Sequence, residues 1–315
     1  MNNIIVTGAS GFIGRNLCNH LSRSGYPIIK VMRAHKDEIA KHEINNIFID
    51  LALNDIPVHI LKNTHIIVHC AGRAHISNEN KSDSYLHRIA NVIATERLAR
   101  QAASAGVKRF VFISSIGVNG RETQLGRKFT ASDPPAPDNA YSQSKYEAEQ
   151  VLQKISNETG LEVVVIRPPL VYGFGAPGNF QRLVKLINIK VPLPFGAIDN
   201  LRSIVALDNL IDLIVICLEH PKAAGQIFLV CDCEDVSTTE LIRRTASAMG
   251  KQIWLIPISK PILRFFGSML GRQELVKNLT GSLQIDSFKT QYLLGWNPKI
   301  NLDEGLHKAV KGINK

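Results

Sequence analysis

A tyrosine and a lysine four residues apart form the most reactive pattern in the chain. Tyr141 and Lys145 stand in a segment with helical periodicity, and residues at this spacing share one helix face. An ammonium group near a phenol favours the phenolate, so we expect Lys145 to lower the pKa of Tyr141. Such a tyrosine can exchange a proton with a sugar or alcohol hydroxyl while a hydride moves to or from a nicotinamide. Ser115, at the end of a predicted strand, could hold the substrate oxygen beside it.

The N-terminus supplies a site for the phosphates of a dinucleotide. A short apolar strand leads into Gly8-Ala-Ser-Gly11-Phe-Ile-Gly14, and a helical pattern follows. The free N–H groups and the positive end of such a helix attract anions, and glycine lets the backbone approach a pyrophosphate closely. The spacing is G-x-x-G-x-x-G instead of the common G-x-G-x-x-G. The strand before it and the helix after it are nevertheless the context that a dinucleotide site requires.

Alternating strands and helices must position these groups. Short apolar runs predict strands at 28–32, 46–49, 65–69, 109–113 and 162–166. Helical patterns cover 12–24, 83–105 and 140–159. This alternation, with right-handed crossovers, predicts an α/β fold with a doubly wound parallel sheet. Ligands in such sheets bind beyond the carboxyl ends of the strands, where both the glycine turn and Ser115 fall.

The pattern changes after about residue 170. Prolines and glycines become frequent between residues 168 and 196 and mark long connections. Short helices are expected at 208–219 and 238–249. We therefore expect a dinucleotide-binding domain with the catalytic groups over 1–170. A smaller C-terminal substrate lobe would cover 171–315, with the chain crossing back to the first domain.

Charge and apolar runs limit the classes of partner. The 315 residues carry a net charge of +10, but the basic residues are scattered and form no run or known nucleic-acid motif. This distribution favours a polyanionic small molecule over nucleic acid. The longest apolar run, 210–218, contains Asp212 and is too short to cross a bilayer, so no membrane partner is expected.

The five cysteines bear on metal binding and on location. They are expected to be small buried side chains in a reducing compartment. Cys231 and Cys233 are too close for a zinc pair and should point to opposite faces of a strand, so no metal site is expected. The N-terminus enters a strand at once and shows no signal peptide, which indicates a cytoplasmic protein.

Together these motifs resemble the extended short-chain dehydrogenase/reductase family, in its branch of nucleotide-sugar epimerases, dehydratases and reductases. The resemblance implies the Rossmann form of the doubly wound sheet. The matching segments run almost from end to end: 7–14, 50–51, 68–72, 91–95, 114–115, 141–145, 167–173, 202–208 and 294–298. The combination is specific for the family and much less so for the reaction.

The resemblance implies a role for each matched position. Ser115, Tyr141 and Lys145 would be the catalytic set, and Tyr141 and Lys145 would also contact the cofactor. The remaining cofactor contacts would be Gly8, Ser10, Gly11, Phe12, Ile13, Gly14, Arg33, Asp50, Leu51, Ala71, Gly72 and Pro168. A homodimer formed through the helices at 83–105 and 140–159 is also expected from the family.

The resemblance places the substrate, a nucleotide sugar, against three residues. Ser115 would contact the sugar, while Asn179 and Arg202 would hold the phosphates. A planar guanidinium suits a diphosphate because it can donate two hydrogen bonds at once. The alternative for Arg202 is a surface salt bridge.

The end of the second predicted strand bears on the cofactor. NAD-selective folds place an acidic residue there, whereas NADP-selective folds place an arginine nearby. Here Arg33, His35 and Lys36 precede the first carboxylate, Asp37, and cations would attract the 2′-phosphate of NADP. We therefore expect NADP, with NAD as the alternative if Arg33 stacks on the adenine.

The choice of cofactor in turn bears on the reaction. A 4-epimerase returns its hydride and generally retains NAD, whereas a reductase consumes NADPH, and the C-terminal half resembles bacterial surface-polysaccharide enzymes of both kinds. The main hypothesis is therefore NADPH-dependent reduction of a UDP-4-keto-6-deoxy-N-acetylhexosamine for O-antigen or capsule. The alternatives are a UDP-glucose or UDP-N-acetylglucosamine 4-epimerase with retained NAD, and a non-catalytic dinucleotide-binding module. A dehydratase is disfavoured because Ile116 and Gly117 follow Ser115 where such enzymes often carry Asp-Glu.

Overall fold

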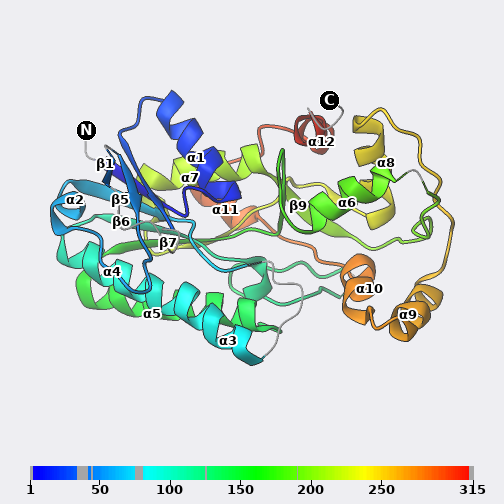
Figure 1. Ribbon diagram of the computed structural model, residues 1–315, viewed down its shortest axis with the longest axis horizontal. Coiled ribbons are helices and arrows are strands. Elements are labelled where there is room, and N and C mark those ends of the chain that lie inside the picture. Colours follow the sequence, from blue (N-terminus) through cyan, green and yellow to red (C-terminus); the bar gives the residue numbers. More distant parts are fainter. Residues whose placement is uncertain are drawn as a thin grey trace.

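An eight-stranded sheet forms the core of one half of the molecule (Figure 1). The computed structural model describes residues 3–33, 42–43, 45–74, 81–124, 126–189 and 191–311. The strand order is β10-β7-β6-β5-β1-β2-β4-β3, and all neighbours are parallel except β3 and β4. The strands are β1 (Asn3–Thr7), β2 (Ile28–Met32), β3 (His42–Glu43), β4 (Asn46–Phe48), β5 (Thr64–His69), β6 (Arg109–Ile113), β7 (Glu162–Arg167) and β10 (Ile227–Leu229). The predicted doubly wound parallel sheet is confirmed, and its order reverses between β1 and β5.

Helices cover both faces of this sheet (Figure 1). One face carries α1 (Phe12–Arg23), α7 (Leu207–Glu219) and α11 (Phe288–Leu294), and the other carries α2 (Val58–Lys62), α4 (Ala94–Ser104) and α5 (Ala140–Thr159). Along β5 the side chains alternate between two cores: Val68 packs with α1 and α7, and Ile67 packs with α4 and α5. Burial on both faces explains why the strands read as continuous apolar runs.

The helix predicted over 83–105 is not regular. It consists of α3 (Lys81–Arg88), a π-helical turn over Ile89–Ile93, and α4. In that turn the Asn91 amide accepts a hydrogen bond from the Arg73 N–H at 2.7 Å and donates one to Ser144 Oγ at 2.8 Å. A single π turn inside an α-helix often marks a functional position. Here it aims Asn91 at the loop after β5 and at α5.

The C-terminal half contains a second sheet that the sequence did not reveal. Its order is β11-β9-β8, and its core lies beneath three helices. The elements are β8 (Leu170–Tyr172), β9 (Arg202–Ala206), β11 (Asp235–Val236), α6 (Asn179–Asn188), α8 (Thr238–Ala248) and α12 (Leu302–Val310). Two further helices, α9 (Lys260–Met269) and α10 (Gln273–Thr280), follow α8 along the chain. With two or three residues, β8 and β11 are too short to show a periodicity, and the five residues of β9 run directly into α7, which is why this region read as irregular connections.

The two neighbouring cysteines do not point to opposite faces of a strand, so that expectation is wrong. Cys233 has a left-handed backbone, with φ of 61°. Its thiol lies 3.5 Å from Ser287 Oγ, and the Cys231 thiol lies 3.6 Å from the same oxygen. The positive φ turns the chain, so the alternation of an extended strand does not apply here.

A buried ionic cluster holds α5 against the ends of β6 and β7. The Arg167 guanidinium donates to both carboxylate oxygens of Glu149, through Nε at 3.0 Å and Nη2 at 2.5 Å, and to Asn119 Oδ1 at 2.8 Å. Ser114, directly before Ser115, donates its hydroxyl to the same carboxylate. Both charges are buried. The cluster therefore connects α5, which carries Tyr141 and Lys145, with the strand ends beneath it.

Neutralising the acidic member of this cluster should destabilise the fold. Glu149→Gln keeps the shape of the side chain but leaves the Arg167 guanidinium buried without a counter-charge. We expect the free energy of unfolding, measured by urea denaturation, to fall by about 3 kcal/mol. The control is Glu147→Gln on the same helix, whose pair with Arg88 is largely exposed at 3.4 Å and should contribute under about 1 kcal/mol. Equal losses in the two variants would contradict this role of the cluster.

Candidate active site

The glycine turn lies where the strand order reverses, against the end of β5. Gly8 has φ of 65°, and a Cβ there would come within 2.7 Å of the Ala71 nitrogen. A Cβ on Gly14 would overlap the Gly8 carbonyl oxygen, which instead accepts a hydrogen bond from the Gly11 N–H at 2.9 Å. Only glycine allows these approaches. The turn thus places the start of α1 directly beyond the ends of β1 and β5.

The N-terminus of α1 is open to an anion. Gly11 is the N-cap residue and provides no side-chain cap, and the first turn of the helix contains no acidic residue. The unsatisfied N–H groups and the positive end of the helix dipole therefore suit the pyrophosphate of a dinucleotide. The Ser10 side chain is exposed, whereas the half-buried Phe12 and Ile13 pack against the core, so these two would offer the cofactor their backbone.

Two of the expected cofactor residues, Arg33 and Asp50, lie side by side. Arg33 Nη2 is 3.6 Å from Asp50 Oδ2, because β4 pairs with β2 and both strands end at this edge. Asp50 was expected to contact the cofactor, but the choice of NADP over NAD considered only the residues up to Asp37 and left this carboxylate out of account. An acidic group here suits the ribose hydroxyls of NAD and repels a 2′-phosphate. His35 and Lys36 lie outside the described residues, and Leu51 packs partly against the core.

Lys145 points from α5 towards the ends of β5 and β6. Its Nζ donates to the Ile113 carbonyl at 2.9 Å and lies 4.5 Å from the centre of the Phe112 ring. A Cβ on Gly72 would lie 3.2 Å from Nζ, so the loop after β5 passes close to the ammonium. Burial lowers the pKa of Lys145 to about 8. The group therefore remains largely protonated at neutral pH.

Ser115 and Tyr141 are brought together as expected, but the electrostatic expectation for the tyrosine is wrong. Burial raises the pKa of Tyr141 to about 12, and its hydrogen bond with Ser115 only partly offsets this. Removal from water penalises the phenolate, while the Lys145 ammonium is bound to the end of β6. Ser115 Oγ also accepts the Gly117 N–H at 3.1 Å, and the Pro168 carbonyl accepts the Ile116 N–H at 3.0 Å. These bonds fix the serine turn to α5 and to the end of β7.

A buried histidine that the sequence analysis did not single out supports this region. Thr95 donates its hydroxyl to the Asn91 carbonyl at 2.7 Å, so it must accept from His69 Nε2, 3.0 Å away. His69 Nδ1 then accepts from the Thr7 hydroxyl at 2.6 Å. Burial, aided by the Lys145 charge, lowers the pKa of His69 to about 3, so the imidazole is neutral. The available signal in the sequence was limited to Thr7 and His69, which are the last residues of two apolar strands.

The two expected phosphate ligands stand apart from this group, in the C-terminal half. Asn179 is the exposed first residue of α6, whose N-cap, Gly178, has φ of 74° and provides no side-chain cap. Arg202 Nη1 donates to the carbonyls of Asn278 at 2.9 Å and Gly281 at 3.1 Å, at the end of α10. Within the described residues no carboxylate pairs with Arg202, so the salt-bridge alternative is wrong there. Burial lowers its pKa.

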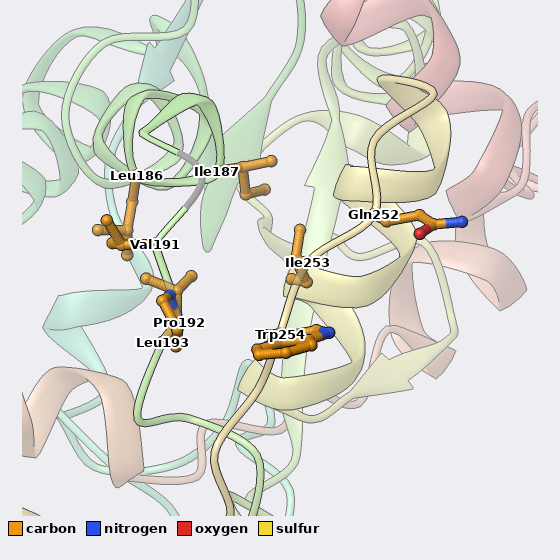
Figure 2. A pocket seen from close by; sticks show the side chains of 8 residues that line it. All are labelled: Leu186, Ile187, Val191, Pro192, Leu193, Gln252, Ile253 and Trp254. Carbon is orange, nitrogen blue, oxygen red and sulfur yellow. The ribbon is translucent and has the colours of Figure 1, made fainter.

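A small cavity lies elsewhere, in the C-terminal half. It measures about 200 Å³ and lies between the end of α6 and the chain after α8 (Figure 2). Its lining is Leu186, Ile187, Val191, Pro192, Leu193, Gln252, Ile253 and Trp254. None of the residues expected to bind cofactor or substrate lines it. We therefore place the candidate site at the strand ends, where the reactive groups converge.

Removing the Lys145 charge should stabilise the protein in a pH-dependent way. The folded pKa of about 8 is below the ordinary 10.5, so the unfolded chain binds more protons between those values and wild-type stability rises with pH across that window. Below pH 8 Lys145 is protonated in both states, and the folded state bears the full free-energy cost of burying its ammonium group. Lys145→Met should therefore raise the free energy of unfolding at pH 7 by about 2 kcal/mol, and the gain should shrink towards pH 10. Urea denaturation at several pH values measures this. Lys154→Met, an exposed change on the same helix, should show no such trend.

Comparison with known proteins agrees with this geometry. Residues 4–231 match the model of the NAD dependent epimerase/dehydratase family. The chain is 42% identical to the UDP-glucose 4-epimerase of Vibrio cholerae over 315 aligned residues, which cover 98% of this chain and 95% of the relative.

Solved structures show the same fold at lower sequence identity. The UDP-glucose 4-epimerase of Thermotoga maritima with UDP-glucose superimposes with a TM-score of 0.77 at 22% identity. The UDP-glucuronic acid 4-epimerase of Bacillus cereus in complex with NAD does so with a TM-score of 0.78 at 22% identity. Both alignments cover 99% of this chain and 98% of the other. With a family match across most of its length, the chain belongs to the NAD dependent epimerase/dehydratase family and is an enzyme of the short-chain dehydrogenase/reductase type.

Proposed function

We propose that this enzyme is a nucleotide-sugar 4-epimerase that works with NAD, with UDP-glucose and UDP-galactose as the first substrate pair to test. The observation that carries the proposal is the 42% identity to a UDP-glucose 4-epimerase along almost the whole of both chains. The Asp50 carboxylate beside Arg33 supports NAD over NADP, because it would repel a 2′-phosphate. The NADPH-dependent reductase hypothesis has less support, since it depends on reading Arg33, His35 and Lys36 as free cations.

The residues at the strand ends fit a dinucleotide. In this proposal the open N-terminus of α1 binds the pyrophosphate, and the Asp50 carboxylate accepts hydrogen bonds at the adenosine end. Lys145 and the backbone at Gly72 line the nicotinamide end, where the missing Cβ lets the backbone approach the Lys145 ammonium and the Asn91 amide. Bound NAD would supply the hydride acceptor and donor. The chain itself has to bind the sugar, hold its C4 oxygen and move one proton.

Ser115 and Tyr141 are suited to that proton transfer. The hydrogen bond between them places two hydroxyls where one substrate oxygen could contact both. Tyr141 takes the proton of the C4 hydroxyl as the alcohol is oxidised, and returns it when the ketone is reduced on the opposite face. With a pKa of about 12 in the protein alone, Tyr141 needs nearby positive charge to act as a base at neutral pH. Lys145, protonated below pH 8, is the cation four residues along the same helix.

We propose that residues 171–315 bind the nucleotide sugar while residues 1–170 bind the cofactor. Arg202 is held by the carbonyls at the end of α10 instead of by a carboxylate, so its other guanidinium N–H groups are available to a diphosphate. The uncapped first turn of α6, which begins at Asn179, is a second donor set for the same anion. A homodimer formed through α5 and the α3–α4 pair is our proposal for the assembly.

The proposal predicts a specific loss in Tyr141→Phe. Purified enzyme incubated with UDP-galactose and no added cofactor should form UDP-glucose by means of retained NAD. Tyr141→Phe should lower that rate by about 10²–10⁴-fold, since it removes the proton carrier, and should retain the same amount of NAD. Tyr146→Phe, a half-buried tyrosine on the same helix, is the control and should keep most of the activity.

Substrate and cofactor assays separate the remaining hypotheses. A reductase would consume NADPH in the presence of a UDP-4-keto-6-deoxy-N-acetylhexosamine, seen as a loss of absorbance of the reduced nicotinamide, and would leave UDP-galactose unchanged. That pair of results would overturn the epimerase proposal. Interconversion of UDP-N-acetylglucosamine and its 4-epimer, without turnover of the unacetylated pair, would keep the reaction and change the substrate.

A further inference from the structure

Helix α9 has apolar side chains on two faces, and the protein covers only one of them. Leu263 and Gly267 are buried, and a Cβ on Gly267 would lie 2.5 Å from Val276 in the neighbouring α10. A second apolar row, at i, i+3, i+4 and i+7, shares the opposite, exposed side of the helix. Its members are Ile262, Phe265, Phe266 and Met269, with exposed fractions of 47, 63, 53 and 70%. Four large apolar side chains on one exposed helix face mark an interaction surface.

The exposed apolar surface continues on both sides of α9 along the chain. Leu270, the next residue, is exposed, and so are Trp254 and Ile256 in the segment that leads from α8 into α9. Trp254 is 79% exposed at the rim of the small cavity (Figure 2). This segment and α9 lie at the end of the molecule farthest from the main sheet (Figure 1). We call the set Trp254, Ile256, Ile262, Phe265, Phe266, Met269 and Leu270 the α9 surface.

Positive charge predominates around the α9 surface. Residues 251–273 contain no Asp or Glu, whereas they include Lys251, Lys260, Arg264 and Arg272. Lys260, Arg264 and Ser268 follow one another at intervals of four, so they form a polar row on a different side of the helix from the exposed apolar row. Lys260 forms an ion pair with Asp199, whereas the exposed Arg264 is in none of the ion pairs found in the described part of the chain. The surface therefore combines aromatic and aliphatic side chains with positive charge.

We propose that the α9 surface docks this enzyme on an anionic phospholipid bilayer. A helix with phenylalanines on its apolar face and basic residues on its polar face is typical of helices that lie in the plane of the membrane interface. Anionic headgroups would attract the basic residues, and the overall charge of +10 acts in the same direction. The helix has ten residues and would lie on the bilayer, not cross it.

A second copy of the chain is a poorer occupant of this surface. A twofold interface brings the same patch of each subunit together, so the basic residues of one copy would face those of the other. Like charges at an interface oppose association.

Among the described residues no helix is long and apolar enough to cross a membrane. The earlier expectation of no membrane partner rested on that length, which a helix lying at the interface does not need.

The test uses vesicles and the tryptophan already present. The chain has two tryptophans, and Trp296 is buried, so a change in emission reports chiefly on Trp254. Wild-type enzyme should float with vesicles of phosphatidylcholine plus phosphatidylglycerol, with its emission shifted to the blue, and should bind pure phosphatidylcholine vesicles less. The double variant Phe265→Ser/Phe266→Ser should lower the vesicle partition coefficient about tenfold or more. Arg264→Glu should lower binding to the anionic vesicles by about fivefold.

The matched control is a second exposed aromatic pair. Phe288 and Tyr292 stack on α11, outside the α9 surface, so Phe288→Ser/Tyr292→Ser should bind vesicles like the wild type. Circular dichroism confirms that each variant is folded. Lack of vesicle binding by the wild type, no blue shift on binding, or equal binding by the Phe265→Ser/Phe266→Ser variant would each overturn the proposal. So would a change from dimer to monomer in that variant without any vesicle binding. Turnover of soluble UDP-galactose is measured separately, so the result of the vesicle experiment neither supports nor contradicts the epimerase proposal.

Discussion

The close approach of the ends of β1 and β5 is the constraint on which the site depends. Gly8 and Ala71 contact each other through their backbones, and a single Cβ on Gly8 would force these two strand ends apart. Because the contact holds, the N-terminus of α1 and the Gly72 loop open into the same space beyond the sheet edge. Lys145 then reaches this space from α5, and the Ser115 turn borders it from the end of β6. Each of these groups comes from a different segment, and the sheet edge aligns them.

The candidate site places several ionisable groups where burial opposes their charged forms. Burial lowers the pKa of Lys145 and raises the pKa of Tyr141, so in both cases it favours the neutral form. His69 is neutral and lies between two threonines. At neutral pH only the Lys145 shift costs folding free energy, because Tyr141 and His69 are largely neutral there in the unfolded chain as well. The Glu149–Arg167 cluster beneath them is fully paired and supplies the rigid support that such a site needs.

Much of the first half could be predicted because its signals are local. The strand 109–113 and the helix 140–159 have the predicted ends, since an apolar run or a helical repeat lies within each segment. The ion pair of Arg33 with Asp50 and the raised pKa of Tyr141 could not be predicted, because they depend on strand pairing and burial. The π turn at Asn91 and the short strands β8 and β11 leave too short a periodic signal to detect. Residues matched to the family were thus easier to identify than their electrostatic states.

The π turn changes the direction in which side chains point along the helical segment 81–104. One additional residue per turn rotates everything on its N-terminal side by about 100° relative to a regular helix. Asn91 faces Arg73 and Ser144 only with that rotation in place. Deleting one residue from this turn would restore a continuous α-helix and its regular hydrogen bonds, and the Asn91 amide would swing away from the site. The same segment would then form a more regular helix but would no longer hold Asn91 against Arg73 and Ser144. The irregular turn is therefore required for this part of the site.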